Sequence, residues 1–568
     1  MLRTAPRPRA RDRAPAAATA APPTAAPAAA PRSEHPFLLR RYVVAFCPRC
    51  HEEGRGGAAG DLGAVRRLSG FLAEADGHVW LVRGCPDHGR IVTLYDEDPR
   101  ILDHLESWTA RTRLPTPDTP DDFDPIPATY LAGLGAAQTQ HTCTLVEDVT
   151  ETCNLACPTC FAGSSPALTG TAPVAVVLAN VDQRLAREGG HLDVVMLSGG
   201  EPTLHTDLLA LLDGLMARSI TRVLVNTNGL RLARDDALVG YLGAHRDRVE
   251  VYLQFDGFDE ATHRHHRGAD LREVKRRAVA RLSAAEVFTT LTMTCALGVN
   301  DHEIGAVVRH ALATPFVCGV SVQPVFGSGR GTGIDPLDRL THTGVLRRLG
   351  EQTDGLVTWH DLIGLPCSHP HCCSIGYLLR TEGGTWRSLV GLLGEDTLRA
   401  HLALVSNRIA DQELPAELRR LVAEALVGLH REGASLARDD VRQLFATVCD
   451  RCDLGLTSLV RAVVTGRDRE ALRRLVGERV VRVTVKPFMD VDLMIEERLL
   501  QCCVHAGTVG AEQHQCVPFC AAQAWGPLAA TKLATAARLR PELDTGEVEA
   551  ATSSVGVLGS DGEVEVTR

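Results

Sequence analysis

Six short apolar runs alternate with amphipathic stretches in the middle of the chain, and this alternation limits the fold more than any other feature of the sequence. Residues 205–219, between the second and third runs, carry five leucines in one broad apolar stripe, as an amphipathic helix does. Repeated strand and helix units predict a parallel sheet that binds ligands at the carboxyl ends of its strands. Six units predict an α/β fold, a partial (β/α)6 barrel of the TIM type. The predicted strands are residues 144–149, 193–197, 222–226, 249–255, 289–293 and 320–326.

Length, charge and cysteine usage narrow the class of protein. With 568 residues, the chain is long enough for more than one domain, and its formal net charge of -10 argues against nucleic acid as a partner. Its 18 cysteines are too sparse for a disulfide-stapled secreted protein, and they stand in short-spaced groups that indicate metal binding. Because no apolar run is long enough to span a membrane and no signal peptide begins the chain, we predict a cytoplasmic protein.

Composition divides the chain into five parts. Residues 1–34 are almost wholly Ala, Pro, Arg and Thr and predict a disordered arm, since such a segment buries too little apolar surface to fold. Residues 35–127 predict a small metal-binding domain and a Pro- and Asp-rich linker, and residues 142–330 the barrel. Residues 331–530 are Cys-rich at both ends, which we expect to meet in space, around a predicted helical stretch at about 375–479. Residues 531–568 form a tail.

The motif "CNLACPTC" directly follows the first predicted strand. It places Cys153, Cys157 and Cys160 on one loop with the spacing C-x3-C-x2-C. Three thiolates this close can hold three irons of a [4Fe-4S] cluster and leave the fourth iron open for chemistry. A zinc knuckle or an electron-transfer cluster would need a fourth local ligand, which this loop does not supply.

The second predicted strand ends in "LSGGEPTLH". A glycine pair there lets the backbone approach a ligand closely, and the neighbouring carboxylate can bind an ammonium group. A Gly-Gly turn after a strand is also a common structural turn, so this motif alone is weak evidence. Its candidate ligand-binding residues are Gly199, Gly200, Glu201 and Pro202.

Together these two motifs resemble the radical S-adenosylmethionine (SAM) enzymes. The resemblance implies that Cys153, Cys157 and Cys160 ligate the cluster. It also implies that the motif after the second strand holds SAM, which the reduced cluster cleaves to methionine and a 5'-deoxyadenosyl radical. "NTNG" (226–229) and "QFDG" (254–257) end the next two strands, where Asn228 and Asp256 are expected to contact SAM, although both motifs also fit plain turns. Thr159 stands where the family usually has an aromatic residue, and Phe161 follows two positions later.

A second group of cysteines precedes the linker. "CPRCH" and "CPDHG" supply a C-x2-C pair and a C-x2-H pair, a set suited to a tetrahedral site for zinc or a single iron. Four protein ligands leave no open position, so the site is expected to be structural. Its predicted ligands are Cys47, Cys50, Cys85 and His88, with His51 as a competitor.

The C-terminal region offers more potential ligands than one cluster needs. "LPCSHPHCCS", "QCCVH" and "CVPFC" contain Cys367, His369, His371, Cys372, Cys373, Cys502, Cys503, His505, Cys516 and Cys520. We favour Cys367, Cys372, Cys516 and Cys520 as ligands of an auxiliary iron-sulfur cluster, because adjacent cysteines do not easily bind one small cluster together. Cys449 and Cys452 form a further C-x2-C pair that fits either ligands or bystanders. Cys295 and Cys318 are isolated and are expected to be core thiols.

The order of these motifs from about residue 37 to residue 525 resembles one radical SAM branch, that of the tetraether lipid synthases and the related archaeal pterin methylases. The resemblance implies carbon-carbon bond formation, by coupling or methylation, on a lipid-like or aromatic small molecule, with an electron donor such as a ferredoxin or flavodoxin. A lipid substrate would require peripheral contact with a membrane. The branch carries a further C-P-x-D-C-G-x-C cluster, but this chain has Ala128, Ala132 and Gly135 there. One auxiliary metal site should therefore be missing, and Cys143 is expected to lack the partners it has in the branch. This absence weakens the lipid-coupling hypothesis more than it weakens the SAM chemistry.

Two other functions fit parts of the pattern. Radical SAM enzymes that modify ribosomal peptides also have Cys-rich C-terminal extensions, but they would predict a peptide-binding domain where this chain has a metal knuckle. A non-enzymatic iron-sulfur redox sensor would have no use for a SAM-binding carboxylate at Glu201.

Overall fold

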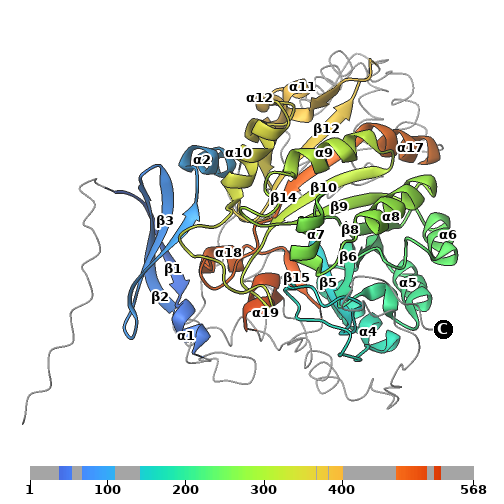
Figure 1. The fold of residues 1–568 in the computed structure, drawn as a ribbon, viewed down its shortest axis with the longest axis horizontal. Coiled ribbons are helices and arrows are strands. Elements are labelled where there is room, and N and C mark those ends of the chain that lie inside the picture. The colour runs from blue at the N-terminus through green and yellow to red at the C-terminus, as the bar shows by residue number, and fades with distance from the viewer. Residues whose placement is uncertain are drawn as a thin grey trace, which may run out of the picture.

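The computed structural model describes residues 37–53, 67–108, 141–365, 368–381, 383–400, 469–507 and 517–525. Its N-terminal part is a four-stranded antiparallel sheet with the strand order β1-β2-β3-β4 (Figure 1). Two helices flank this sheet. The elements are β1 (Leu38–Phe46), α1 (Pro48–Glu52), β2 (Arg67–Ala75), β3 (His78–Cys85), β4 (Gly89–Asp96) and α2 (Pro99–Ser107).

The second sheet confirms the predicted partial barrel. Its six central strands lie side by side in chain order, each parallel to its neighbours, and each contains or overlaps one of the six predicted runs. Apolar residues of these strands form the largest hydrophobic core. The strands are β5 (Thr144–Thr150), β6 (Leu192–Gly199), β7 (Ile220–Thr227), β8 (Val249–Gln254), β9 (Thr289–Cys295) and β10 (Val317–Pro324).

Helices between these strands cover the outside of the barrel (Figure 1). The predicted leucine stripe lies on α5, where Leu208, Leu211, Leu212 and Leu215 are buried while Leu209 is 44% exposed. The stripe is therefore one residue narrower than predicted, since Leu209 faces away from the sheet. The covering helices are α4 (Val174–Arg187), α5 (Leu208–Met216), α6 (Asp236–Ala244), α8 (Arg272–Ala284) and α9 (Ile304–Ala313), while α7 (Glu260–Arg267) follows the carboxyl end of β8 and α10 (His342–Gln352) follows β10.

The C-terminal region extends the barrel sheet at both edges, and here the prediction of a helical stretch at about 375–479 is wrong at its start. Residues 374–380 form β12, which pairs antiparallel with β14, and β14 adds to the barrel parallel to β10. At the other edge β15 pairs parallel with β5. The elements are η4 (Trp359–Asp361), β11 (Ile363–Gly364), β12 (Ser374–Arg380), β13 (Trp386–Ser388), α11 (Leu389–Leu393), α12 (Glu395–Ala400), α17 (Arg469–Arg479), β14 (Val480–Val485), α18 (Glu496–Leu500), β15 (Val504–Ala506), β16 (Val517–Pro518) and α19 (Phe519–Trp525).

The N-terminal sheet docks against the C-terminal region (Figure 1). Ala45 of β1 forms an antiparallel bridge with Ile495, and a guanidinium nitrogen of the buried Arg83 donates to the carbonyl oxygen of Asp492 at 2.8 Å. The rings of Phe46 and Trp525 meet edge to face, with centroids 4.9 Å apart. These contacts hold the N-terminal domain beside the elements that carry the C-terminal cysteines.

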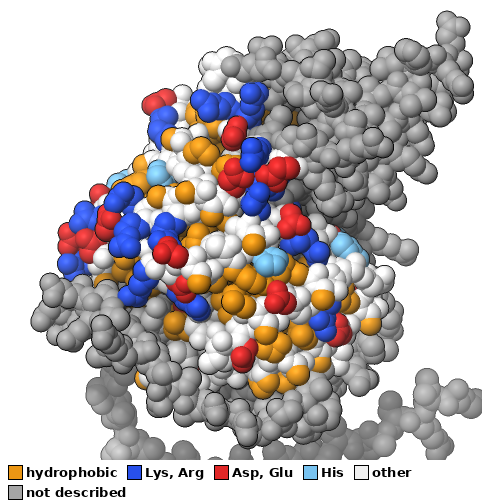
Figure 2. Space-filling model, turned by 90° about the vertical axis from the view of Figure 1, so that its right-hand side faces the viewer, with side chains coloured by type: hydrophobic (Ala, Val, Ile, Leu, Met, Phe, Trp, Pro, Cys, Tyr) orange, Lys and Arg blue, Asp and Glu red, His pale blue; other side chains and the backbone are white. Residues whose placement is uncertain are grey.

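The face of the molecule that carries α5, α6 and α8 shows intermixed acidic and basic side chains with apolar atoms between them (Figure 2). Ion pairs such as Arg218–Asp182 and Arg276–Glu273 join neighbouring charges on these helices. This face is therefore not a continuous basic surface of the kind that binds nucleic acid. None of the helices in the described ranges is both long and apolar enough to cross a membrane.

Candidate functional site

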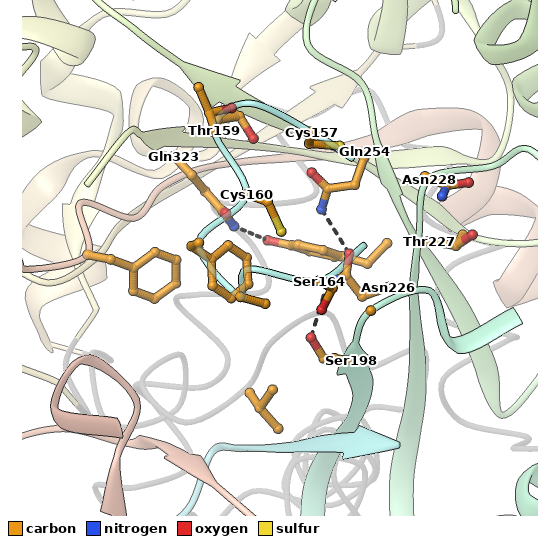
Figure 3. Close-up of a pocket in the computed structure, with 18 of the residues that line it drawn as sticks. Cys157, Thr159, Cys160, Ser164, Ser198, Asn226, Thr227, Asn228, Gln254 and Gln323 are labelled. Carbon is orange, nitrogen blue, oxygen red and sulfur yellow. Dashed lines mark hydrogen bonds between the residues drawn. The ribbon is translucent and has the colours of Figure 1, made fainter. Parts of the chain in front are cut away.

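A cavity of about 140 Å³ lies at the carboxyl ends of the barrel strands, where the fold predicts a ligand (Figure 3). Its wall brings together most of the predicted cluster and SAM residues: Cys153, Cys157, Cys160, Gly199, Gly200, Glu201 and Asn228. Pro202 and Asp256 were also predicted to bind the cofactor, but they lie outside this wall. Pro202 begins the short 3-10 helix η3 (Pro202–Leu204), and Asp256 is fully buried behind the wall.

The cluster loop leaves β5 and is held from across the barrel. The guanidinium of Arg330 donates to the carbonyl oxygens of Cys157, Gly163 and Ser164 at 2.9, 2.8 and 2.7 Å. The preceding residue, Gly329, has a φ of +58°, and a Cβ there would lie 2.4 Å from the carbonyl oxygen of Cys160. This clamp orders the loop that carries the three thiols, and no sequence motif pointed to it.

The glycine pair supports the same loop. A Cβ on Gly199, which has a φ of +109°, would lie 2.4 Å from the carbonyl oxygen of Thr150, and one on Gly200 would lie 2.1 Å from that of Thr152. The amide of Gly200 donates to Thr150 at 2.6 Å, and that of Glu201 donates to Thr152 at 2.8 Å. The pair is therefore needed for close packing of the turn against the backbone that leads into Cys153.

The Glu201 carboxylate is buried and accepts four hydrogen bonds from its own chain. Oε1 accepts from the amide and the hydroxyl of Thr203 at 3.1 and 2.6 Å and from the hydroxyl of Thr227 at 2.7 Å. Oε2 accepts from the amide of Asn228 at 2.7 Å. Asn228 in turn donates to the Asn154 side chain at 2.8 Å. Glu201 thus joins the ends of β6 and β7 to the cluster loop. The sequence predicted that this carboxylate binds an ammonium group, and it did not predict this structural role.

Two cations stand next to the cluster loop. Arg267 binds both carboxylate oxygens of Asp256 at 2.6 Å, lines the cavity, and hydrogen-bonds Cys157. Burial raises the pKa of the Cys157 thiol, and Arg267 opposes that rise. The fully buried Lys275 donates to the carbonyl oxygen of Asn228 at 2.6 Å; burial lowers its pKa to about 8. Three converging thiols beside buried cations fit the anionic thiolates that hold an iron-sulfur cluster.

Polar side chains from successive strands line one side of the cavity (Figure 3). The Gln254 amide donates to the Asn226 side chain at 2.8 Å, and Asn226 donates to the hydroxyl of Ser198 at 3.5 Å. The Gln323 amide donates to the hydroxyl of Tyr252 at 3.2 Å. These groups can hydrogen-bond the polar parts of SAM or of a second ligand.

Four phenylalanines also line the cavity and form an aromatic wall: Phe161, Phe326, Phe488 and Phe519. Phe161 stacks on Phe326 with centroids 5.9 Å apart and meets Phe519 edge to face at 5.9 Å, and Phe488 lies 4.8 Å from Phe519. Thr159, at the position where the family has an aromatic residue, instead hydrogen-bonds His266 across 3.1 Å. The aromatic surface is thus supplied by Phe161 and by rings from distant segments, and it suits a flat apolar or heteroaromatic molecule.

A second cavity, of about 60 Å³, adjoins the first and contains the C-terminal cysteines. Six cysteines line it: Cys143, Cys372, Cys373, Cys502, Cys503 and Cys520. The prediction that the two Cys-rich ends of the C-terminal region meet in space is therefore confirmed. Cys143 lines the same cavity as the other five cysteines. Of the predicted auxiliary ligands, Cys372 and Cys520 are among these six, whereas Cys367 and Cys516 lie outside the described residues, as do Cys449, Cys452 and the segment 128–135.

The candidate cysteine and histidine ligands of this region differ in their hydrogen-bond partners. The Cys372 sulfur accepts from Nε of the buried Arg498 at 3.2 Å, and the Cys520 sulfur accepts from the amide of Met489 at 3.3 Å. His371 instead binds the hydroxyl of Tyr95 and the carboxylate of Glu106, both at 2.8 Å. His369, His371 and His505 do not line the cysteine cavity. Cys295 and Cys318 are buried in hydrophobic clusters, as predicted.

The N-terminal sheet assembles the predicted tetrahedral metal site. The ligand atoms of Cys47, Cys50, Cys85 and His88 all lie within 4.8 Å of one another, and His51 is not part of this group. The Cys50 and Cys85 sulfurs are 3.8 Å apart, and Nδ1 of His88 lies 3.4–3.5 Å from the three sulfurs. Bonds of about 2.3 Å to a tetrahedral zinc place two sulfurs about 3.8 Å apart, so the geometry fits the ion.

Charge and hydrogen bonding at this site also fit a cation. Burial, followed by the neighbouring sulfurs of Cys47 and Cys85, raises the pKa of the Cys50 thiol to about 12. A bound cation would remove this penalty, because metal-bound cysteines are thiolates. Nε2 of His88 is 2.7 Å from a carboxylate oxygen of Glu53, which orients the ring so that Nδ1 faces the sulfurs.

Comparisons with known proteins match the barrel and the N-terminal sheet. Residues 148–311 match the radical SAM superfamily, and residues 39–97 match the HMPTM N-terminal zinc ribbon domain. The chain is 23% identical over 515 residues to the 7,8-dihydro-6-hydroxymethylpterin dimethyltransferase of Methanocaldococcus jannaschii, and the alignment covers 85% of this chain and 93% of that protein.

Two solved structures are also similar. One is SuiB of Streptococcus suis bound to precursor peptide SuiA, with 18% identity and a TM-score of 0.32 over 38% of this chain and 46% of SuiB. The other is a radical SAM methyltransferase from Sphaerobacter thermophilus, with 13% identity and a TM-score of 0.29 over 57% of this chain and 76% of that one. The barrel therefore carries a radical SAM domain at residues 148–311, and over most of its length the chain resembles the branch that contains the archaeal pterin methylases.

Proposed function

We propose that this enzyme forms a carbon-carbon bond by methylating a small heteroaromatic substrate of the pterin type. The observation that carries the proposal is the aromatic wall of Phe161, Phe326, Phe488 and Phe519, which lies in the same cavity as the three cluster cysteines. A flat ring stacked there would place a ring carbon near SAM. The similarity to a pterin dimethyltransferase supports the same substrate class over a lipid.

When bound, the cluster supplies the electron that cleaves SAM, and an external reductant such as a ferredoxin or flavodoxin restores it. The chain's own residues set up this step. Cys153, Cys157 and Cys160 would hold the cluster, while Arg267 hydrogen-bonds Cys157 and compensates the charge of the thiolates. The backbone of Gly199 and Gly200 and the polar side chains of Asn226 and Gln254 would hold SAM.

Substitution of Glu201 tests the SAM site. Glu201→Ala leaves the Thr203, Thr227 and Asn228 donors unpaired, at about 1–3 kcal/mol for each buried group, so SAM cleavage should fall at least about tenfold. Thr227→Val removes one of the same hydrogen bonds and should cost less. The measurement is 5'-deoxyadenosine released from reconstituted protein. Unchanged release by Glu201→Ala would show that Glu201 does not support the SAM site.

We also propose that the second cavity holds an auxiliary iron-sulfur cluster through Cys372 and Cys520. Both sulfurs accept hydrogen bonds there, and Cys502 lines the same cavity as a third ligand candidate. Arg482, Lys486 and Arg498 lie in its wall and suit an anionic cluster. Cys367 and Cys516 are the other two of the four predicted ligands, and Cys502 is an alternative to one of them.

The auxiliary cluster predicts a difference between two cysteine variants. Cys520→Ala should lower the iron content of reconstituted protein by about the four irons of one cluster, while the core variant Cys318→Ala keeps the full content. Iron and sulfide analysis with EPR of the reduced protein gives the comparison. Equal iron in both variants would exclude Cys520 as a ligand.

A further inference from the structure

Lys486 lies between the two cavities, so its ammonium group borders the substrate cavity as well as the cavity of the proposed auxiliary cluster. It follows β14 directly and lines both cavities. Its Nζ stands 5.9 Å from the ring centroid of Tyr252, which also belongs to both walls. No ion pair joins Lys486 to a carboxylate anywhere in the described ranges, although Arg267 and Lys275 nearby both have oxygen partners.

An ammonium group in such a place needs an acceptor. Burial of a cation without a counter-charge is costly. The titratable groups that act on Lys486 are Tyr252, Cys373, Cys503 and the cation Arg482, and none of them is a carboxylate. On the side of the first cavity its neighbours in the wall include Phe488. The polar amide of Gln323 is already directed at Tyr252. A ligand that stacks on the aromatic wall would therefore bring its polar edge toward Lys486.

We propose that Lys486 is a specificity-determining residue that donates a hydrogen bond to a ring oxygen of the heteroaromatic substrate. This inference rests on the proposed function and adds the substrate group that the site recognises. The stacked ring supplies most of the buried apolar area, and the charged hydrogen bond fixes which edge of the ring points toward the cysteine cavity. An aliphatic lipid chain offers no such acceptor, so Lys486 selects against it.

Binding of two ligands tests this role. The probes are 7,8-dihydro-6-hydroxymethylpterin and its analogue lacking the 4-oxo group, titrated anaerobically into reconstituted enzyme with SAM present. The parent enzyme should prefer the oxo ligand by about 10- to 100-fold, the effect expected of one charge-assisted hydrogen bond. Lys486→Met should lose this preference, and Lys486→Arg should keep most of it. Iron content and melting temperature verify that the variants bind their iron-sulfur clusters and fold.

The outcomes separate the two proposals. If the parent enzyme binds the pterin but Lys486→Met retains the same preference for the oxo ligand, the role of Lys486 is wrong and the proposed function stands. If the parent enzyme binds neither ligand, the pterin-type substrate is wrong and the role of Lys486 falls with it. If Lys486→Met instead loses iron while the preference persists, Lys486 serves the auxiliary cluster, which also overturns the inference.

Discussion

Cys157→Ala is expected to abolish the cleavage of SAM while the N-terminal metal stays bound. Cys157 lies in the cavity wall beside the other two cluster cysteines, and Arg267 hydrogen-bonds it. Removing a group that only hydrogen-bonds a metal ligand already lowers metal affinity or activity about 10–100-fold. Removing a ligand itself should have a larger effect. The measurements are 5'-deoxyadenosine formed under a strong reductant and metal content per chain.

The control for this variant is another buried cysteine. Cys318→Ala removes a thiol from the hydrophobic cluster with Phe288 and Phe316, and Cys318 does not line the SAM cavity. It should keep both the cluster and SAM cleavage. Substantial 5'-deoxyadenosine from Cys157→Ala would mean that the cluster is bound elsewhere.

Cys47→Ala is expected to release the N-terminal metal and to destabilise the N-terminal domain strongly. Structural zinc in small domains contributes about 10–16 kcal/mol of apparent binding free energy, much of which appears as folding stability. The N-terminal sheet also packs against the C-terminal region through Phe46 and Arg83. Its unfolding would therefore loosen the elements next to the cysteine cavity. Calorimetry and metal analysis should show a lower melting temperature and one metal fewer per chain.

His51→Ala is the matched control for the metal site. His51 is adjacent to Cys50 but does not belong to the group of four ligand atoms. Its removal should leave metal content and melting temperature close to those of the parent. A full metal complement and an unchanged melting temperature in Cys47→Ala would contradict a structural site.

The parts of the fold that local sequence determines were predictable. The six barrel strands follow from short apolar runs, and the cluster loop follows from cysteines close in the chain. Strand β14 was missed because residues 469–479, directly before it, are helical and the surrounding region is rich in helix-forming residues. Residues 481–485 alternate apolar and polar side chains, V-R-V-T-V, which is the local signal that could have revealed the strand, although Arg482 and Thr484 are buried inside the sheet.

The site was predictable where one motif supplies it and not where distant segments meet. The four metal ligands were predicted from two short motifs, "CPRCH" and "CPDHG", which the N-terminal antiparallel sheet brings together. Arg330 and Lys486, by contrast, come from segments far along the chain from the cluster motif: Arg330 holds the cluster loop, and Lys486 lines the cavity. Asp256 was predicted to contact SAM from its position after β8, but its carboxylate is held by Arg267, which takes its place at the cavity wall.

One measurement tests the proposed function most directly. Protein reconstituted without oxygen would receive SAM, a strong reductant and 7,8-dihydro-6-hydroxymethylpterin, and one chromatographic run with mass detection would quantify 5'-deoxyadenosine, S-adenosylhomocysteine and pterin products. We expect 5'-deoxyadenosine together with a methylated pterin; S-adenosylhomocysteine would identify SAM as the methyl donor. 5'-Deoxyadenosine with an unchanged pterin would contradict the pterin-type substrate, and no 5'-deoxyadenosine from protein with an intact cluster would contradict the radical chemistry.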